Sequence, residues 1–230
     1  NLDHCNSHSS FKDKVSMSNL CQEITLPTTP IQDIHDEQGE IALCILSAVN
    51  VGGLNDLSEL ENICDLSVRA LEQIIDYQDY PVKAAEVSTK KRRSLGIGYI
   101  GLAHYLAKNG VKYSDPKAWD LVDRLTEAFQ YNLLRASCNI AMEKGKCEGF
   151  ERTKYADGLL PIDHYKKDVD KIVPHKQRMA WESLRKDIAK YGLRHSTLSA
   201  QMPSESSSVV SNETNGIEPP RALMAIKKSK

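Results

Sequence analysis

The sequence has little of what marks several large classes of protein. Its 230 residues contain six cysteines, none in a Cys-x-x-Cys pair, and seven histidines without i, i+4 spacing on a helix. Six cysteines are too few for a disulfide-stapled scaffold of this length, and no Cys/His set has zinc spacing. We therefore predict no metal site, a reducing compartment (the cytoplasm), and core packing as the default role of each cysteine.

An excess of charge of one sign and long apolar runs are also missing. Lys plus Arg is 30 and Asp plus Glu is 31, which leaves a net charge of −1. A chain with this balance has no excess of positive charge to attract nucleic acid or an anionic membrane surface, so neither is an expected partner. No run approaches the ~18 apolar residues that suggest a transmembrane helix. The first residue is Asn1 rather than Met, which favours a piece of a longer polypeptide or one product of a split gene.

Apolar patterning predicts an α/β architecture with mostly parallel strands. The nearly continuous apolar run 41–51 is typical of a strand buried on both faces. Asp56 with Glu59 forms a capping-box pattern, and Asp115 with Pro116 marks the start of the longest helix. The expected helices cover residues 56–77, 97–109, 115–144, 161–168 and 177–191. The expected extended segments cover 20–26, 197–201 and 223–226, and the expected loop covers 203–208.

A first group of candidate residues is Asn19, Cys21 and Glu23, at positions i, i+2 and i+4. On an extended backbone these three side chains point the same way. An amide can hold a hydroxyl, a carboxylate can take its proton, and a thiol can carry redox or radical chemistry. The structural alternative is a polar strand face with a buried cysteine.

Two further candidates lie elsewhere in the chain. Cys44 sits inside the apolar run and is either core packing or a redox thiol whose partner is not near in sequence. The segment 203–208 carries Pro203, Ser204, Glu205 and two more serines between a strand and a helix. Backbone N–H groups and hydroxyls at such a junction suit an anion such as phosphate, and a plain capped turn is the alternative.

Two other patterns point to structure rather than chemistry. Residues 96–101 match G-x-G-x-x-G, but the basic residues before them do not predict the strand that a dinucleotide site requires. We interpret these glycines as close helix packing. The basic run 90–93 has no interleaved aromatic residue and is interpreted as solvated surface.

Seven motifs taken together resemble the large, catalytic subunit of class I ribonucleotide reductase, in its enterobacterial and phage style. They occur in family order and span nearly the whole chain. The motifs are NLDHCN at 1–6, SNLCQEI at 18–24, GEIALC at 39–44, DYQDYP at 76–81, RSLGIG at 93–98, PSESS at 203–207 and NGIEPPR at 215–221.

The resemblance implies a fold and a set of roles. The fold would be the second half of a ten-stranded α/β barrel, incomplete at both ends across residues 1–230, with Cys21 on a central finger loop. Cys21 would become the thiyl radical, Glu23 would take the 3′-hydroxyl proton, and Asn19 would bind the ribose hydroxyls. Cys44 would be one of two reducing cysteines. The substrate-binding residues would be Asn19, Glu23, Leu46, Pro203, Ser204, Glu205, Ser206 and Ser207, of which Ser206 stands where the family often has Thr.

The resemblance also implies an activity that depends on other segments. The chain would reduce ribonucleoside diphosphates to deoxyribonucleotides, the precursors of DNA. The rest of the large subunit, a separate metal-containing small subunit that supplies the radical, and thioredoxin or glutaredoxin would be its partners. It would hold no cofactor itself, and allosteric nucleotides would bind upstream. Two alternatives stay open: a catalytically silent remnant that only assembles with other reductase chains, and a glycine-rich nucleotide-binding module.

Overall fold

A computed structural model describes residues 10–173, 176–222 and 224. Two strands, β1 (Ile45–Asn50) and β2 (Leu95–Ile100), pair in parallel, with Ile45 opposite Leu95 and Asn50 opposite Ile100. Residues 197–200 run along the other edge of β2, where Ser199 forms a parallel bridge with Ile97. Parallel strands joined through helices confirm the α/β class, while the predicted strand 197–201 is reduced to that single bridge.

Six α-helices surround these strands in the described part of the chain. They are α2 (Glu59–Tyr77), α3 (Lys83–Arg92), α4 (Leu102–Lys108), α5 (Pro116–Lys144), α6 (Trp181–Tyr191) and α7 (Glu205–Val210). Short 3-10 helices cover Glu148–Arg152, Lys154–Asp157 and Lys167–Lys171. None of the helices in the described residues is long and apolar enough to cross a membrane.

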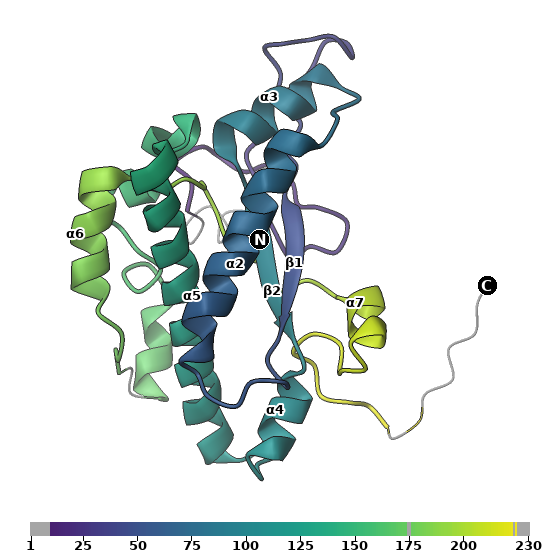
Figure 1. Ribbon diagram of the computed structural model, residues 1–230, viewed down its shortest axis with the longest axis vertical. Helices are drawn as coiled ribbons and strands as arrows, with labels where there is room; N and C mark the ends of the chain where they lie inside the picture. The colour runs from purple at the N-terminus through teal and green to yellow at the C-terminus, as the bar shows by residue number, and fades with distance from the viewer. Residues whose placement is uncertain (1–9, 174–175, 223, 225–230) are drawn as a thin grey trace.

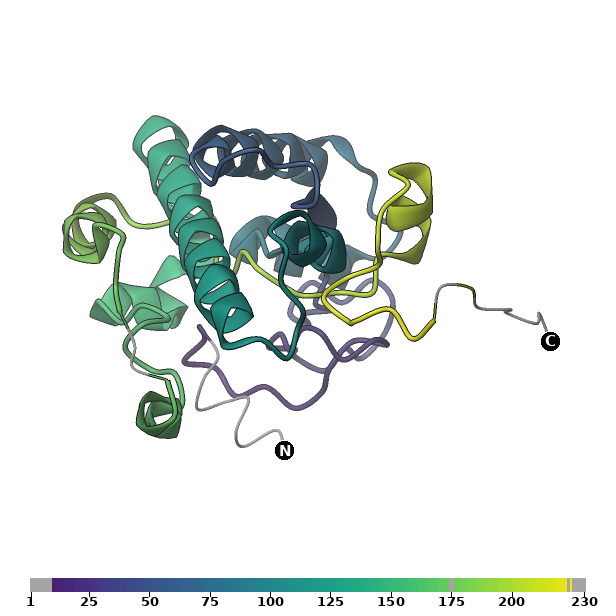
Figure 2. The ribbon, with the colours of Figure 1, turned by 90° about the horizontal axis from the view of Figure 1, so that it is seen from below.

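The main core lies between the sheet and the long helices. Leu60 and Ile75 of α2 and Leu125 and Leu133 of α5 are fully buried in it, together with Leu95 of β2. Helices α2 and α5 lie side by side over the strands, and α7 stands on the far side of β1 from α5 and α6 (Figure 1). Seen from below, the N-terminal segment runs on the side of the sheet away from α2 (Figure 2). The sheet therefore has one side closed by helices and one side that is less covered.

Helices with clear local signals fall where the sequence predicts them. Helix α5 begins with Pro116 at its first position and ends at Lys144, before Gly145 at φ 85°. Helix α6 ends as predicted before Gly192 but starts only at Trp181. Helix α2 starts at Glu59 rather than Asp56, although the Glu59 carboxylate accepts the Asp56 backbone N–H as a capping box requires.

The glycine-rich segment corrects the sequence interpretation. Residues 95–100 form β2, buried along its whole length, and the helix expected from residue 97 begins only at Leu102. A Cβ on Gly98 would lie 2.5 Å from the carbonyl oxygen of Ala200. The glycines thus allow close approach of a neighbouring segment to a strand, not to a helix.

The basic run is solvated only at its start, where Lys90 is exposed. It closes helix α3, which the sequence analysis missed, and both Arg92 and Arg93 are buried. The Arg92 guanidinium donates to Glu40, and Arg93 donates to Glu72 at 2.7 Å. Acidic partners outside α3 explain how two arginines fit inside the fold.

Several other expectations are corrected. The strand predicted at 41–51 is shorter, and it is not buried on both faces, since Leu46 is exposed. Residues 161–165 form turns and bends, and only residues 167 and 168 of the predicted helix 161–168 are helical, at the start of a 3-10 helix. The loop 203–208 contains the start of α7. Of the strand predicted at 223–226, only residue 224 is described and it is not in a strand, so the prediction lies almost entirely outside the described residues.

Candidate active site

Cys21 lies at the tip of a tight hairpin, not on an extended strand. Ser18 and Thr25 form an antiparallel bridge at its base, and the Gln22 N–H donates to the Asn19 carbonyl at 3.2 Å. Gln22 adopts φ 63°, which reverses the chain and breaks the alternation that the extended prediction requires. Cys21 is exposed at this tip.

Asn19 stabilises the hairpin through its own side chain. Its Oδ1 accepts the Ile24 N–H at 3.3 Å, and its backbone N–H donates to the Ile24 carbonyl at 3.3 Å. The carbonyl end of the amide is therefore engaged within the hairpin. The NH₂ end is the part of Asn19 suited to donate to a ligand.

A hollow of about 560 Å³ brings Cys21 together with the serine-rich segment. We call it the serine hollow. The residues that line it are Cys21, Leu46, Ser47, Ala48, Met202, Pro203, Ser204, Glu205, Ser206 and Ser207. Three segments far apart in sequence meet here: the hairpin tip, strand β1 and the start of α7. All the predicted residues from 203 to 207 therefore share one hollow with Cys21 and Leu46.

A second hollow of about 690 Å³ adjoins the first. It is lined by Asn19 and Cys44 among other residues, and Leu46 borders both hollows. Leu46 lies on β1 with 47% of its surface exposed. The predicted residues other than Glu23 thus line two hollows that meet at Leu46, whereas Glu23 lines neither of them.

Glu23 lies close enough to Cys44 to influence its titration. Burial raises the pKa of the Cys44 thiol to about 11, and the negative charge of Glu23 adds to the increase. Cys44 is therefore a protonated thiol near neutral pH. The Glu23 Oε2 atom is buried and has no hydrogen-bond partner within the described residues. A buried carboxylate oxygen without a partner is unusual and is suited to accept a proton or hydrogen bond from a ligand.

The glycines of β2 make room for this site. Gly96 pairs with Leu46 and Gly98 with Ala48 in the strand register. A Cβ on Gly96 would lie 2.7 Å from Leu46 Cδ2 and 3.5 Å from the Cys44 sulfur. The G-x-G pattern therefore provides space for the side chains of β1 that face the site, rather than binding a dinucleotide.

The serine-rich segment is held by hydrogen bonds at both ends. The Ser204 N–H donates to Asn215 Oδ1 at 2.7 Å, and the Ser208 hydroxyl donates to the Glu205 carbonyl at 2.8 Å. Because α7 begins at Glu205, the N–H groups of Ser206 and Ser207 belong to its first turn, where α-helical geometry supplies no carbonyl partner.

Ser47, Ala48 and Met202 also line the serine hollow, although the sequence assigns none of them a role. Ala48 could have been found from strand periodicity, since Leu46 and Ala48 share one face of β1. Met202 enters through the tertiary approach of residues 200–202 to Gly98, which no local pattern reveals.

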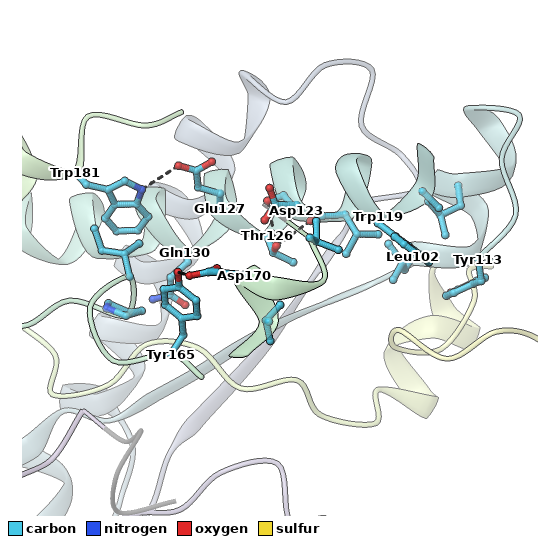
Figure 3. A pocket seen from close by; sticks show the side chains of 17 residues that line it. Leu102, Tyr113, Trp119, Asp123, Thr126, Glu127, Gln130, Tyr165, Asp170 and Trp181 are labelled. Carbon is cyan, nitrogen blue, oxygen red and sulfur yellow. Dashed lines mark hydrogen bonds between the residues drawn. The ribbon is translucent and has the colours of Figure 1, made fainter. Parts of the chain in front are cut away.

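A third hollow of about 650 Å³ lies away from all predicted site residues, between α5 and residues 161–173 (Figure 3). It is mostly apolar and aromatic, and its carboxylates are already engaged. Glu127 accepts the Trp181 indole N–H at 3.0 Å, Asp123 pairs with Arg178, and Asp170 accepts the Tyr165 hydroxyl. These carboxylates are therefore held in bonds within the fold.

The geometry defines a class before any comparison is made. An α/β fold that brings an exposed thiol and a serine-rich segment to one hollow, with a second thiol in the adjoining hollow, has the parts that an enzyme domain with thiol chemistry needs.

Comparison with known proteins then gives the family. The family model described as "Ribonucleotide reductase, barrel domain" matches residues 1–230, and the chain belongs to this family. The chain is 60% identical to the ribonucleoside-diphosphate reductase subunit alpha of Haemophilus influenzae, over all of this chain and 31% of that protein. It is 55% identical to the ribonucleoside-diphosphate reductase 1 subunit alpha of Escherichia coli, again over all of this chain and 31% of that protein. The phage T4 subunit alpha is 44% identical over all of this chain and 30% of its own length. The chain therefore spans about a third of the relatives it matches.

Proposed function

We propose that this chain forms the substrate-reducing part of a ribonucleotide reductase catalytic subunit and acts on ribonucleoside diphosphates. The observation that carries the proposal is the serine hollow, in which the Cys21 thiol and the segment 203–207 line one space. A sugar near the thiol and a diphosphate near the serines would fit this arrangement. The ten-stranded barrel, with the Cys21 hairpin as its central finger, would be completed by segments that the relatives have beyond the matched region.

Cys21 is the residue that we assign to hydrogen abstraction. Its exposure at a hairpin tip supports this role, because a buried thiol could not meet a substrate. A separate metal-containing small subunit would supply the oxidising equivalent that converts the thiol to a thiyl radical. The radical would then take the 3′ hydrogen of the ribose and return a hydrogen atom at the end of the cycle.

Glu23 and Asn19 are assigned to the ribose hydroxyls. The unpartnered Oε2 of Glu23 would accept the proton of the 3′-hydroxyl, which helps the 2′ oxygen to leave as water. The NH₂ group of Asn19 would donate to a hydroxyl oxygen while its carbonyl keeps the hairpin in shape.

Cys44 is assigned to the reduction itself. Replacing the 2′ C–OH bond by a C–H bond consumes two electrons and two protons and releases one water. Cys44 and a second cysteine outside this chain would supply them and end as a disulfide, which thioredoxin or glutaredoxin would reduce again. The raised pKa of Cys44 supports this role because it keeps the hydrogen on the sulfur until the substrate needs it.

The serine-rich segment is assigned to the diphosphate. The N–H groups of Ser206 and Ser207 in the first turn of α7, with their hydroxyls, would bind phosphate oxygens. The Glu205 side chain would point away from the phosphates, because its charge repels them. Leu46 and Pro203 would provide apolar walls.

Peptide mapping after a single turnover tests the proposal. The sample is an assembled reductase, meaning this chain with the further segments of its relatives and the radical-supplying subunit. We expect one deoxyribonucleotide per site and a disulfide from Cys44 to a cysteine outside this chain, and we expect no turnover from this chain alone. A Cys44 disulfide to Cys64, Cys138 or Cys147, all buried here, would contradict the assignment. An assembly that forms but never reduces substrate would identify the chain as a silent assembly partner.

A further inference from the structure

A turn at residues 211–215 follows the serine-rich segment, residues 203–208, and is hydrogen-bonded to it. The Glu213 N–H donates to the Ser208 carbonyl at 2.8 Å, and Asn215 Oδ1 accepts the Ser204 N–H at 2.7 Å. The turn therefore contacts the serine-rich segment near its start, at Ser204, and at its last residue, Ser208. Ser204 is itself buried, so its N–H needs a protein acceptor, and Asn215 provides it.

The same turn is anchored to the ends of both strands. Gly101, just after β2, donates its N–H to the Thr214 carbonyl at 2.9 Å. The side chain of Glu213 is almost fully buried and bonds His104 Nδ1 at 2.9 Å. A Cβ on Gly52 would lie 2.5 Å from Glu213 Oε2, and a Cβ on Gly101 would lie 2.7 Å from Glu213 Cγ. The Glu213 side chain thus occupies a space at the carboxyl ends of β1 and β2 that a side chain at Gly52 or Gly101 would fill.

These contacts form a chain from the rigid sheet to the proposed diphosphate site. The sheet fixes Glu213 and Thr214, and the turn then fixes the position of the Asn215 side chain. Asn215 in turn fixes the Ser204 backbone immediately before the N–H groups of Ser206 and Ser207. A site built from backbone N–H groups depends on such support, because the groups cannot be re-aimed one at a time.

We propose that Asn215 is a positioning residue for diphosphate binding, which acts by holding the Ser204 N–H and with it the segment 204–207. The inference rests on the proposed diphosphate role of that segment. Asn215 does not line the serine hollow, so its contribution passes through Ser204 rather than through contact with substrate.

The test is steady-state kinetics of the assembled reductase with Asn215→Ala. Loss of one hydrogen bond that orders the segment should raise KM for the ribonucleoside diphosphate by about three- to tenfold and leave kcat within about twofold. Hydrogen exchange of a peptide covering residues 203–208, measured without substrate, should become faster in the variant. The control is Asn62→Ala, which removes an exposed asparagine of α2 and should change neither quantity.

The outcomes separate this inference from the function on which it rests. An unchanged KM, an equal fall in kcat, or unchanged exchange at residues 203–208 would overturn the role of Asn215. A wild-type assembly that binds no ribonucleoside diphosphate would instead overturn the proposed function. If the alanine variant does not fold, Asn215→Gln keeps an amide but displaces its oxygen from Ser204, and the same two measurements decide.

Discussion

The two sides of the sheet differ in whether their polar side chains have hydrogen-bond partners within the chain. On the helix-covered side, Glu72 of α2 has only 1% of its side chain exposed and accepts hydrogen bonds from three donors. These donors are Arg93 Nε at 2.7 Å, Arg194 Nε at 2.8 Å and His195 Nε2 at 3.0 Å. On the other side, the Cys21 thiol is exposed and Glu23 Oε2 has no partner among the described residues.

The difference separates groups that stabilise the fold from groups that are open to a ligand. A buried charge with a full set of donors stabilises one arrangement of the chain, and loss of the charge leaves its donors buried and unpaired. A polar group without a partner in the folded chain keeps its bonding capacity for a substrate. Substitutions on the helix side should therefore change stability, and those on the site side should change turnover.

The largest expected effect is the loss of turnover in Cys21→Ser. A hydroxyl cannot form the sulfur radical, so we expect reduction by the assembled enzyme to fall by at least about a thousandfold, as for other essential catalytic groups. Because Cys21 is exposed at a hairpin tip, the midpoint of thermal unfolding should stay unchanged. Cys64→Ser, which places a hydroxyl in the core instead, should show the reverse pattern. Appreciable nucleotide reduction by Cys21→Ser would refute the radical assignment.

The matching substitution on the helix side is Glu72→Ala. It leaves Arg93, Arg194 and His195 without their shared acceptor, and breaking a buried ion pair in this way costs about 3–5 kcal/mol. Urea unfolding of the assembled protein measures the loss, and Glu61→Ala on the exposed face of the same helix is the control. If Glu72→Ala and Glu61→Ala unfold at the same urea concentration, the cluster does not carry the stability assigned to it.

The same cluster predicts a dependence of stability on pH. Burial alone would raise the pKa of Glu72, but hydrogen bonds from His195, Arg93 and Arg194 outweigh it and lower the pKa from 4.5 to about 2. The unfolded chain therefore takes up this proton first, and the stabilisation present above pH 4.5 disappears as the pH falls from 4.5 to about 2, on the order of 3 kcal/mol.

His195 contributes in the same direction at higher pH. Burial lowers its pKa from 6.5, so the unfolded chain gains its proton first once the pH falls below 6.5. Urea unfolding at pH values on both sides of 6.5 and of 4.5 should show stability falling in both ranges. Glu72→Gln should reduce the slope below pH 4.5, to which other carboxylates with a lowered pKa such as Glu40 and Glu127 also contribute, and an unchanged slope in this variant would contradict the assignment.

Two glycines of β2 offer a matched pair with smaller effects. A Cβ on Gly98 would meet the Ala200 carbonyl oxygen at 2.5 Å, and backbone cannot easily move, so Gly98→Ala should cost about 1–3 kcal/mol. A Cβ on Gly96 would meet the exposed end of Leu46, which can rotate away. The free energy of unfolding of Gly96→Ala should therefore lie nearer to that of the wild type. Its KM for the ribonucleoside diphosphate should rise, because Leu46 would move within the hollows. If Gly96→Ala and Gly98→Ala lower the free energy of unfolding equally, the Leu46 side chain cannot rotate away and resists displacement as strongly as the Ala200 backbone does.

Local signals in the sequence predicted the elements that depend on local contacts. Asp115, Pro116 and Gly145 marked the ends of α5, and the apolar stripe of α2 marked the helix down to Tyr77. The family motifs predicted a set of site residues, and the serine hollow brings Cys21, Leu46 and residues 203–207 of that set together.

Features that depend on distant contacts could not be read in this way. Arg92 and Arg93 looked solvated because their acceptors, Glu40 and Glu72, lie 52 and 21 residues away in sequence. Gly96 and Gly98 have low strand propensity, and only the approach of Leu46 and Ala200 explains why they lie in a strand. The reversal at Cys21 depends on Gln22 at positive φ, which that residue type does not predict.

The smallest expected effect separates the backbone from the side chains at the proposed diphosphate site. Ser207→Ala removes one hydroxyl and should weaken binding of the ribonucleoside diphosphate by about two- to tenfold. Ser207→Pro removes the N–H as well and disfavours the helical conformation of Ser206, so it also bends the segment. The proline variant should therefore bind more weakly than the alanine variant, with exposed Ser211→Ala as the control. If alanine weakens binding as much as proline does, the hydroxyls hold the diphosphate and the backbone N–H groups do not.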